Sequence, residues 1–285
     1  MNVIQVIVSG ILIGGVYSLV SVGLTLIFGV LNVINFAHGS YVMLAMFVAY
    51  FAWAQAGLDP LAAIPVAAVA LAAAGYVTYW LVIRRTMSKG GVAQIVSTFG
   101  LLVLIQGAAE VLWTPNDRAV AHPLAGRFEL AAGGLVVTGP QVIAFCGAIA
   151  CTAGLAAFIN HTETGTAIRA TGEDRGAAAL MGINVRNIDA LTWALGLGCC
   201  GVAGALLANS YTVSPTAGAT FGLIAFFAVA LGGFGSVLGA GIAGIVMGIV
   251  QNVVGLYAAQ YSLAALMGVY LLVVVARPQG ILGSR

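Results

Sequence analysis

Charged residues are scarce in this sequence. Its 285 residues include only 10 lysines and arginines and 8 aspartates and glutamates, so that 6% are charged. Soluble domains carry about a quarter of their residues as these four types. With 61% apolar residues and a mean hydropathy of +1.09, this chain cannot cover itself with a polar surface. We therefore predict an all-α polytopic membrane protein, without the clustered basic face that nucleic-acid binding requires.

Several motifs of chemistry are also missing. The four cysteines lie in apolar stretches without a CxxC or Cys/His cluster, so the sequence supports neither a metal site nor a disulfide framework. The one lysine is Lys89 in SKGG, so there is no GxxxxGK[ST] loop for ATP, and active transport would need a separate motor. We find no GxSG nucleophile with a partner histidine, no HExxH and no paired intramembrane aspartates. An intramembrane enzyme or an ion-coupled carrier therefore has few candidate residues.

Long apolar runs dominate what is present. A helix needs about 20 apolar residues to cross the hydrocarbon core. The N-terminus lacks the basic region of a signal peptide, so we take it as the first span. The predicted spans are Val3–Gly29, Phe36–Ala56, Leu61–Ile83, Val92–Trp113, Leu135–Ile159, Ile188–Asn209, the short run Phe221–Leu231, Val237–Tyr257 and Ser262–Ala276. We expect eight or nine crossings, depending on whether 221–231 crosses or is re-entrant.

Glycine is abundant, with 39 residues. Small residues allow membrane helices to approach closely, and they recur four apart at Gly10/Gly14, Gly235/Gly239 and Gly244/Gly248. We therefore expect helix contacts at these pairs.

The basic residues predict the orientation. They gather at Arg84, Arg85 and Lys89, at Arg169, Arg175 and Arg186, and at Arg277 and Arg285. The positive-inside tendency puts these three regions in the cytoplasm. The interval 114–134, where acidic residues offset the basic ones, and the N-terminus then lie outside.

Polar residues interrupt the apolar pattern in two places, at 29–40 and at 209–222. Both follow a glycine-rich helix and precede an apolar run, which suggests an internal duplication. Irregular backbone at membrane depth is tolerated where protein buries it or where it lines a water-filled cavity. The alternative for 209–222 is an outer loop.

Candidate pathway residues follow from these polar positions. They are Asn32, Asn35, His38, Gln94, Ser97, Thr98, Gln251 and Asn252. Each has a structural alternative: His38 can satisfy a backbone carbonyl that the break frees, and the others can form hydrogen bonds between helices. Asn32 and Asn35, three apart, are expected on one helical face. Glu110 lies near the outer end of its span, where it can reach the interface.

The longest polar interval is 160–187, which contains a short helix signal. Thr171 and Asp174 form a predicted capping pair, and Gly182 fits the left-handed position that closes a helix. Ala177, Leu180 and Met181 form one small apolar stripe. So short a helix is unstable alone, so the stripe packs either on the protein's own spans or in a groove of a soluble partner.

These residues resemble a known family. Gly176-Ala177-Ala178 followed by Gly182 is similar to the E-A-A-x-x-x-G core of the coupling loop in ABC importer permeases, with glycine in place of glutamate and without the later I-x-L-P. Four blocks, GLTLIFGVLNVINFAHGSYVML (23–44), RATGEDRGAAALMGINV (169–185), AFFAVALGGFGSVLGAGIAGIVMGIVQN (225–252) and RPQGILG (277–283), together closely resemble the shorter permease of branched-chain amino acid (LIV-type) ABC importers.

The resemblance implies a type II importer permease of the bacterial inner membrane, one domain over residues 1–285 with a cytoplasmic coupling loop at 160–187. Its implied partners are a second related permease, two cytoplasmic ATPases that bind ATP and Mg²⁺, and a periplasmic binding protein. The implied solutes are branched-chain or other neutral amino acids. The alternative is a stand-alone channel or secondary carrier for a small polar solute.

The resemblance also implies which residues meet the ATPase. The coupling helix would comprise Glu173, Asp174, Arg175, Gly176, Ala177, Ala178, Leu180, Met181 and Gly182. Because Gly176 replaces the glutamate, we expect Glu173, Asp174 or Arg175 to supply the polar contacts. We also expect Ala178→Asp to break ATPase association while membrane insertion is retained.

Overall fold

The computed structural model describes residues 3–120, 127–130, 135–277 and 279–282. Arg285, one of the basic residues from which the orientation was predicted, and Gly283, the last residue of the fourth sequence block, lie outside the described residues.

Within the residues that the structure describes, nine apolar helices correspond one for one to the predicted spans. They are α1 (Val3–Leu31), α2 (His38–Ala54), α3 (Ala63–Thr78), α5 (Gly91–Trp113), α6 (Gly139–His161), α9 (Val185–Ala208), α10 (Ala217–Gly232), α11 (Val237–Ala258) and α12 (Ser262–Ala276). α3 continues through a π-helical turn, η1 (Tyr79–Ile83), into α4 (Arg84–Thr86) and η2 (Met87–Lys89), and η3 (Ala259–Tyr261) joins α11 to α12. Between α6 and α9 lie two polar helices, α7 (Glu163–Glu173) and α8 (Arg175–Leu180).

One boundary prediction was wrong at the start of the fifth long span. Leu135 belongs to a strand, β2 (Leu135–Thr138), which pairs antiparallel with β1 (Arg127–Leu130), and α6 begins only at Gly139. Thr138 and Gln141 form a capping box there, with Pro140 in the first turn, and these signals fix the helix start. The hairpin adds a small β element to an otherwise helical chain.

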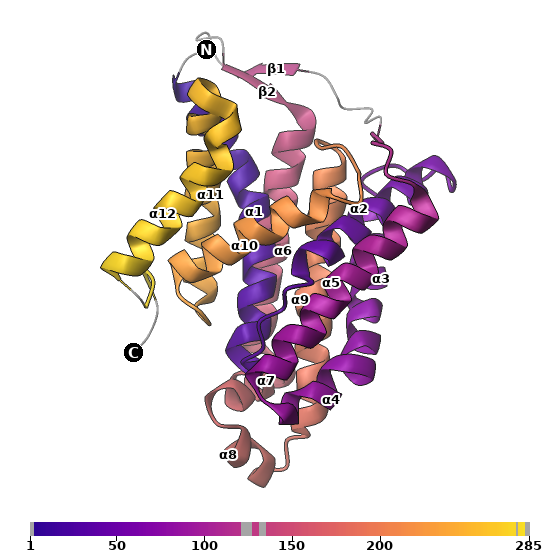
Figure 1. Cartoon of the computed structure of the whole chain (residues 1–285), viewed down its shortest axis with the longest axis vertical. Helices are drawn as coiled ribbons and strands as arrows, with labels where there is room; N and C mark the ends of the chain where they lie inside the picture. The colour runs from indigo at the N-terminus through magenta and orange to yellow at the C-terminus, as the bar shows by residue number, and fades with distance from the viewer. Residues whose placement is uncertain (1–2, 121–126, 131–134, 278, 283–285) are drawn as a thin grey trace.

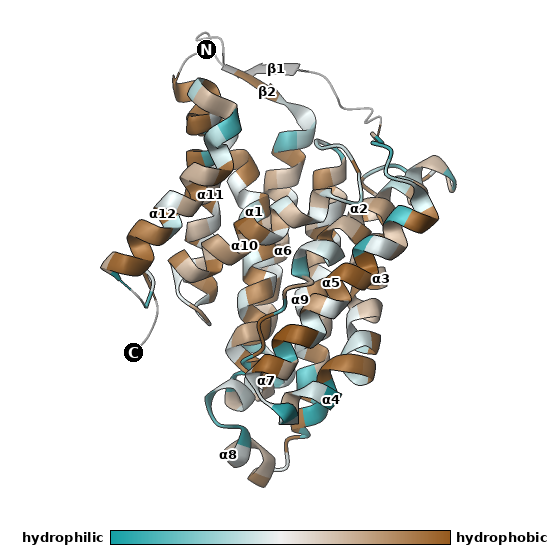
Figure 2. Cartoon of the chain, in the orientation of Figure 1, coloured by the Kyte–Doolittle hydropathy of each residue, from teal (hydrophilic) through white to brown (hydrophobic). Residues whose placement is uncertain are grey.

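The polar groups gather at the two ends of the bundle. α4, α7 and α8 lie at the lower end in Figure 1, and the N-terminus and the β-hairpin lie at the upper end. Figure 2 shows hydrophilic residues on α4, on α7 and where α7 leads into α8, below an apolar middle. Arg84 and Arg85 thus share an end with Arg169, Arg175 and Arg186. This agrees with the predicted orientation, with the lower end in the cytoplasm.

Glycines set the packing of α1 against α11. A Cβ on Gly14 would lie 2.7 Å from the Cα of Ile245, and one on Gly248 would lie 2.5 Å from the Cα of Gly14. The predicted contacts at Gly10/Gly14 and Gly244/Gly248 are confirmed. At Gly235/Gly239 the contacts are of a different kind: Gly235 lies in the turn before α11, with a φ of +84°, against Gly29 of α1, and Gly239 packs on Gly232 of α10.

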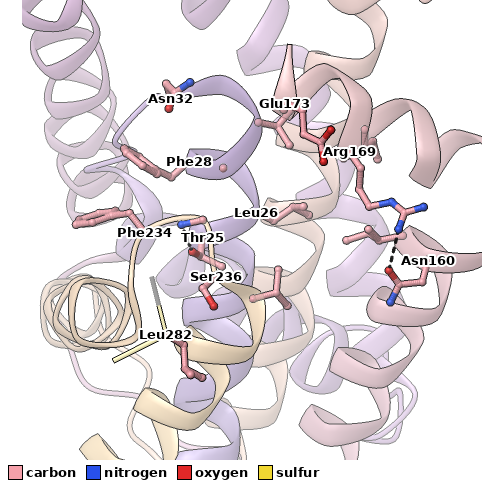
Figure 3. A pocket seen from close by; sticks show the side chains of 17 residues that line it. Thr25, Leu26, Phe28, Asn32, Asn160, Arg169, Glu173, Phe234, Ser236 and Leu282 are labelled. Carbon is pink, nitrogen blue, oxygen red and sulfur yellow. Dashed lines mark hydrogen bonds between the residues drawn. The ribbon is translucent and has the colours of Figure 1, made fainter. Parts of the chain in front are cut away.

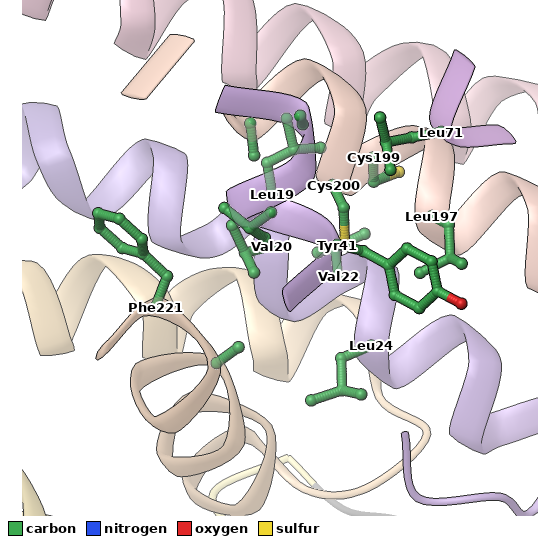
Figure 4. Packing of buried hydrophobic residues seen from close by; sticks show 14 of the residues in the cluster. Leu19, Val20, Val22, Leu24, Tyr41, Leu71, Leu197, Cys199, Cys200 and Phe221 are labelled. Atoms are coloured by element: carbon green, nitrogen blue, oxygen red, sulfur yellow. The ribbon is translucent and has the colours of Figure 1, made fainter. Parts of the chain in front are cut away.

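The core surrounds α1 and α9. Side chains from α1, α2, α3, α9 and α10 interdigitate there, including Val20, Tyr41 and Leu197, which are almost fully buried (Figure 4). Cys199 and Cys200 pack inside this core as small side chains. The middle of α1 is therefore surrounded by protein, unlike a helix at the lipid boundary.

Both predicted interruptions break the helical path. α1 ends at Leu31 and α2 begins at His38, while α9 ends at Ala208 and α10 begins at Ala217. α2 has 17 residues and α10 has 16, so they are about 26 and 24 Å long, short of the hydrocarbon thickness of about 30 Å. The starts of the two short helices touch, since a Cβ on Gly39 would lie 2.7 Å from the Cα of Gly222.

Around the two breaks, the helices of the N-terminal half of the chain pack on helices of the C-terminal half, and in matching pairs. α1 packs on α11 and α9 packs on α3, while α2 packs on α9 and α10 packs on α1. α1 runs downward in Figure 1 and α9 runs upward. This is the pattern expected of two repeats of opposite orientation, α1–α2–α3–α5 and α9–α10–α11–α12. The arrangement supports the predicted internal duplication and is typical of transporters.

Candidate functional site

A pocket of about 650 Å³ opens at the lower end, and all four sequence blocks that carry the resemblance contribute to it (Figure 3). Its lining residues are Thr25, Leu26, Phe28, Gly29, Val30 and Asn32 from the first block, Arg169, Gly172 and Glu173 from the second, Phe234 to Val237 from the third, Leu282 from the fourth, and Ile159, Asn160 and Ile168. Segments far apart in the sequence therefore form one structural unit at the lower end of the bundle in Figure 1.

Backbone contacts hold this unit together. The N–H of Gly235 donates to Oγ1 of Thr25 at 3.0 Å and so fixes the α10–α11 turn on α1. The N–H groups of Ile281 and Leu282 donate to the carbonyls of Leu231 and Gly232 at 2.8 and 3.1 Å. These carbonyls are among the last of α10, which lack partners within the helix. Gly280 permits the approach, with a φ of +79°.

α7 packs against the lower end of α1. This helix was not predicted from the sequence. Thr162 caps it by accepting a hydrogen bond from the N–H of Gly165 at 3.0 Å. Gly172 lies against α1, where a Cβ would be 3.1 Å from the carbonyl oxygen of Gly29. Arg169 donates to Oδ1 of Asn160 at 3.4 Å, and exposed Glu173 lies at the pocket rim.

The predicted cap of the next helix was wrong by three residues. Thr171 is buried within α7 and donates to the carbonyl of Ala167 at 2.7 Å. Asp174 is the cap of α8: its Oδ1 accepts from the N–H groups of Gly176 and Ala177 at 2.8 and 2.9 Å. The negative charge of Asp174 at the N-terminus of α8 also interacts favourably with the helix dipole.

The end of α8 follows the prediction. Gly182 has a φ of +84°, the left-handed conformation that glycine adopts without strain. The N–H of Ile183 donates to the carbonyl of Ala178, and that of Gly182 to Ala179, both at 3.1 Å. This pair of bonds is the Schellman motif. α9 begins at Val185, so α8 connects rigidly to the next span.

The apolar stripe of α8 faces outward. Leu180 and Met181 are 90% and 84% exposed, and Ala177 is exposed as well, whereas Ala178 is 4% exposed and packs on its own chain. The expectation for Ala178→Asp was therefore wrong in its reason: a carboxylate there would disturb the loop itself. Two large apolar side chains are therefore exposed at the polar end of the bundle.

Arg175, the first residue of α8, points into the chain. Nη1 donates to the carbonyl of Val30 at 3.0 Å, and Nη2 forms an ion pair with Oδ2 of Asp189 at 2.5 Å. The same carboxylate oxygen accepts from the hydroxyl of Tyr79 at 3.3 Å. Asp189, in α9, is 2% exposed. Of the three residues expected to offer polar contacts, Asp174 caps α8, Arg175 binds within the chain, and Glu173 remains exposed.

Neither Asp189 nor Tyr79 was among the predicted site residues. The signal for Asp189 was its position, since it is an acidic residue directly after the start of an apolar span at Ile188. A carboxylate there needs a partner, because burying a charge without one is costly. Its partner lies 14 residues earlier, in a different helix, and the sequence pattern does not identify it.

The residues of the first break do not share one face. Asn32 ends α1 in a left-handed conformation with a φ of +54°, and its N–H donates to the carbonyl of Phe28. Asn32 lines the pocket of about 650 Å³ described above. Asn35 is buried, and its Oδ1 accepts a hydrogen bond from the N–H of Ala37 at 3.1 Å. The expectation of one helical face was wrong because residues 32–35 are not helical.

His38 is fully buried between α1 and α9. Its Nε2 donates to the carbonyl of Val20 at 2.9 Å, which leaves Nδ1 as the acceptor, 3.6 Å from the thiol of Cys200. This geometry supports the structural alternative, with one difference: the carbonyl belongs to the middle of α1 and not to the break.

The polar residues of α5 connect neighbouring inner segments. Oγ1 of Thr98 donates to the carbonyl of Ile34 in the break at 3.1 Å. Ser97 lies 3.2 Å from the hydroxyl of Thr86, and Gln94 donates to the carbonyl of Met87 at 3.3 Å. These contacts support a role in joining helices.

Gln251 and Asn252 lie away from these groups, in a second pocket of about 610 Å³. It is lined by α1, α6, α11 and α12 and includes the polar side chains of Ser9, Gln141 and Tyr211. The predicted pathway residues therefore divide between two pockets, the buried break and the inner part of α5. Their role in conduction stays a prediction.

Comparison with known proteins identifies close sequence relatives. The sequence profile of the family described as branched-chain amino acid transport system / permease component matches residues 6–276. The high-affinity branched-chain amino acid transport system permease protein BraD of Pseudomonas aeruginosa is 32% identical, over 98% of this chain and 95% of its own. LivH of Escherichia coli strain K12, described in the same words, is 30% identical with the same coverage. The probable branched-chain amino acid transport permease protein LivH of Methanocaldococcus jannaschii is 29% identical over 85% of this chain and 78% of its own. No solved structure matches this chain.

Proposed function

Because this chain belongs to the family of branched-chain amino acid transport system permease components, we propose that α8 is the point where an ATPase partner drives it. The chain is a multi-pass permease of the bacterial inner membrane and a subunit of an ABC importer, and the alternative of a stand-alone channel or carrier is not supported. As a permease component, it is not itself the ATPase.

The exposed pair Leu180 and Met181 carries the proposal. Each is at least 84% exposed on a helix that is capped at both ends and joined directly to α9. Burying such a side chain contributes about 1.5–3 kcal/mol. A groove on the ATPase that covers the pair would therefore bind α8 firmly, and exposed Glu173 beside it can supply a polar contact.

The solute that we propose is a branched-chain amino acid. The relatives BraD and LivH are described as high-affinity branched-chain amino acid permeases, and they align along nearly the whole chain. A periplasmic binding protein would select the solute. The pathway itself would then need only weak, uncharged polar groups such as those of Gln251 and Asn252, since a tight site would slow release.

The assembly that we propose contains a second, homologous permease and two cytoplasmic ATP-binding subunits. ATP and Mg²⁺ would be bound by those subunits, with no cofactor held by this chain. The two inverted halves then give a physical route to alternating access, in which one half moves against the other around the breaks at 32–37 and 209–216.

Leu180→Asp tests the contact with the ATPase. Losing the burial of this side chain should weaken association at least tenfold, because about 1.4 kcal/mol corresponds to a factor of ten. Co-purification of the ATPase with the tagged permease measures it. The matched control is Asn187→Asp, which adds the same charge at an exposed position in the first turn of α9. Wild-type stoichiometry with Leu180→Asp would contradict the assignment.

Uptake of radiolabelled leucine into proteoliposomes tests the transport itself. With the permeases, ATPases and binding protein present, leucine should accumulate only when ATP is supplied. Accumulation without ATP or without the ATPases would show that the importer mechanism is wrong. Accumulation of a different amino acid in place of leucine would contradict the proposed solute alone.

A further inference from the structure

The side chain of Arg175 joins the coupling helix to two membrane spans at once. We propose that Arg175 is a positioning residue that transmits movement of α8 to α1 and α9, so that ATP hydrolysis is tied to opening of the pathway. The inference rests on the proposed function and adds a residue outside the surface that meets the ATPase. The side chain is 37% exposed at the protein's inner edge.

The first connection is to the end of α1. The carbonyl of Val30 is one of the last four carbonyls of α1, and such carbonyls have no N–H donor within their own helix. The guanidinium donates to this carbonyl at 3.0 Å, and a cation at a helix C-terminus is favoured by the dipole. Asn32, two residues later, turns the chain out of the helix. Arg175 therefore holds α1 at the point where the first break begins.

The second connection is to α9. The ion pair with Asp189 is 2.5 Å long, and the carboxylate is 2% exposed. Taking away the arginine would leave a buried charge unpaired, so separating the two groups is costly and the ion pair couples α8 to α9. The hydroxyl of Tyr79 on the same carboxylate extends the link to the π-helical turn η1 at the inner end of α3. Such turns are frequent at functional sites.

α8 is held at both ends, so we expect Arg175 to move together with the rest of the helix. Asp174 fixes the start of the helix, the bonds around Gly182 fix its end, and α9 follows at Val185. A push on Leu180 and Met181 therefore displaces Arg175 with the whole helix. From Val30 the movement reaches residues 32–37, which the hydroxyl of Thr98 ties to α5 through the carbonyl of Ile34.

The test measures leucine uptake per ATP hydrolysed in the complete reconstituted importer. Arg175→Ala should retain ATPase association and hydrolysis but lower the ratio at least fivefold. Arg175→Lys, a single cationic donor in place of a two-pronged one, should give an intermediate ratio. The matched control is Arg186→Ala, which removes an exposed arginine from the first turn of α9 and should leave the ratio unchanged.

A double variant separates positioning from stability. Arg175→Met with Asp189→Leu replaces the ion pair by apolar side chains of similar volume, an exchange that buried pairs often tolerate. We expect its melting temperature to lie above that of Arg175→Ala, because no buried charge is left unpaired, while its uptake per ATP stays at least fivefold below the wild type, because no donor reaches Val30. A wild-type ratio in the double variant or in Arg175→Ala would overturn the inference.

The two proposals fail in different ways. If wild-type uptake requires ATP but the variants keep its ratio, only the role of Arg175 is wrong. If wild-type uptake proceeds without ATP, the proposed function is wrong.

Discussion

His38 holds two helices together through one hydrogen bond in the core. Its imidazole is fully buried, and Nε2 donates to the carbonyl of Val20 in α1. Hydrogen bonds between membrane helices contribute about 0.6 kcal/mol on average and up to about 1.7 kcal/mol. This places His38 among the groups that fix the position of α2, the helix after the first break.

Replacing His38 decides between its two roles. His38→Leu should destabilise the protein by about 0.5–2 kcal/mol, since the donor to Val20 is lost, whereas His38→Gln can still donate and should lie closer to wild type. Thermal unfolding of the purified protein in detergent measures the difference. An unchanged melting temperature for His38→Leu together with lost uptake would instead indicate a role in the pathway.

At the scale of elements, the α1–α11 contact depends on glycine at particular positions. A Cβ on Gly244 would lie 2.4 Å from the backbone nitrogen of Ser18, which cannot move without its helix. On the same helix, a Cβ on Gly241 would lie 3.9 Å from the nearest atom, a methyl group of Val22. The two positions therefore form a matched pair.

Gly244→Ala should destabilise the fold by about 1–3 kcal/mol, as overpacking does in a well-packed core. Gly241→Ala should be neutral or slightly stabilising, because alanine favours a helix over glycine by about 1 kcal/mol. Melting temperature and the yield of monodisperse protein measure both. Equal behaviour of the two variants would contradict the proposed packing of α1 on α11.

Elements defined by composition were predictable. The long apolar runs and the breaks around Asn32 and Pro215 arise from local residue types, since polar residues and proline weaken helices wherever they occur. The end of α8 at Gly182 has the same origin. The start of α8 was misplaced because Thr171 and Asp174 are both good caps, and only the inclusion of Thr171 in α7, where its hydroxyl donates to the carbonyl of Ala167, decides between them.

Contacts between distant elements were not predictable. The bonds of Arg175 to Val30 and Asp189 join residues 145 and 14 positions apart, and no periodicity in the sequence carries that information. The direction of the α8 stripe was left open for the same reason. Ala178 faces inward and Leu180 faces outward because of how α8 leans on the spans, and this is a tertiary property.

At the scale of the whole molecule, the inverted arrangement requires the chain to alternate in direction. The N-terminus and the hairpin share one end, and α4, α7 and α8 share the other (Figure 1). Asp59, between α2 and α3, is exposed on the side of the N-terminus, and Arg186 begins α9 on the side of α8. With the basic end in the cytoplasm, Asp59 must face the periplasm.

Cysteine labelling tests this orientation. In a variant whose four native cysteines are replaced by alanine or serine, Asp59→Cys should react with a membrane-impermeant maleimide added outside intact cells. Arg186→Cys and Arg277→Cys should react only after the membrane is opened, because both then lie in the cytoplasm. The cysteine-free parent must retain uptake and gives the background. Labelling of Arg277→Cys from outside would mean that the chain crosses the membrane one time fewer after α9. The second half would then lack a crossing that the first half has, and the contacts between α1–α5 and α9–α12 could not come from two complete inverted repeats.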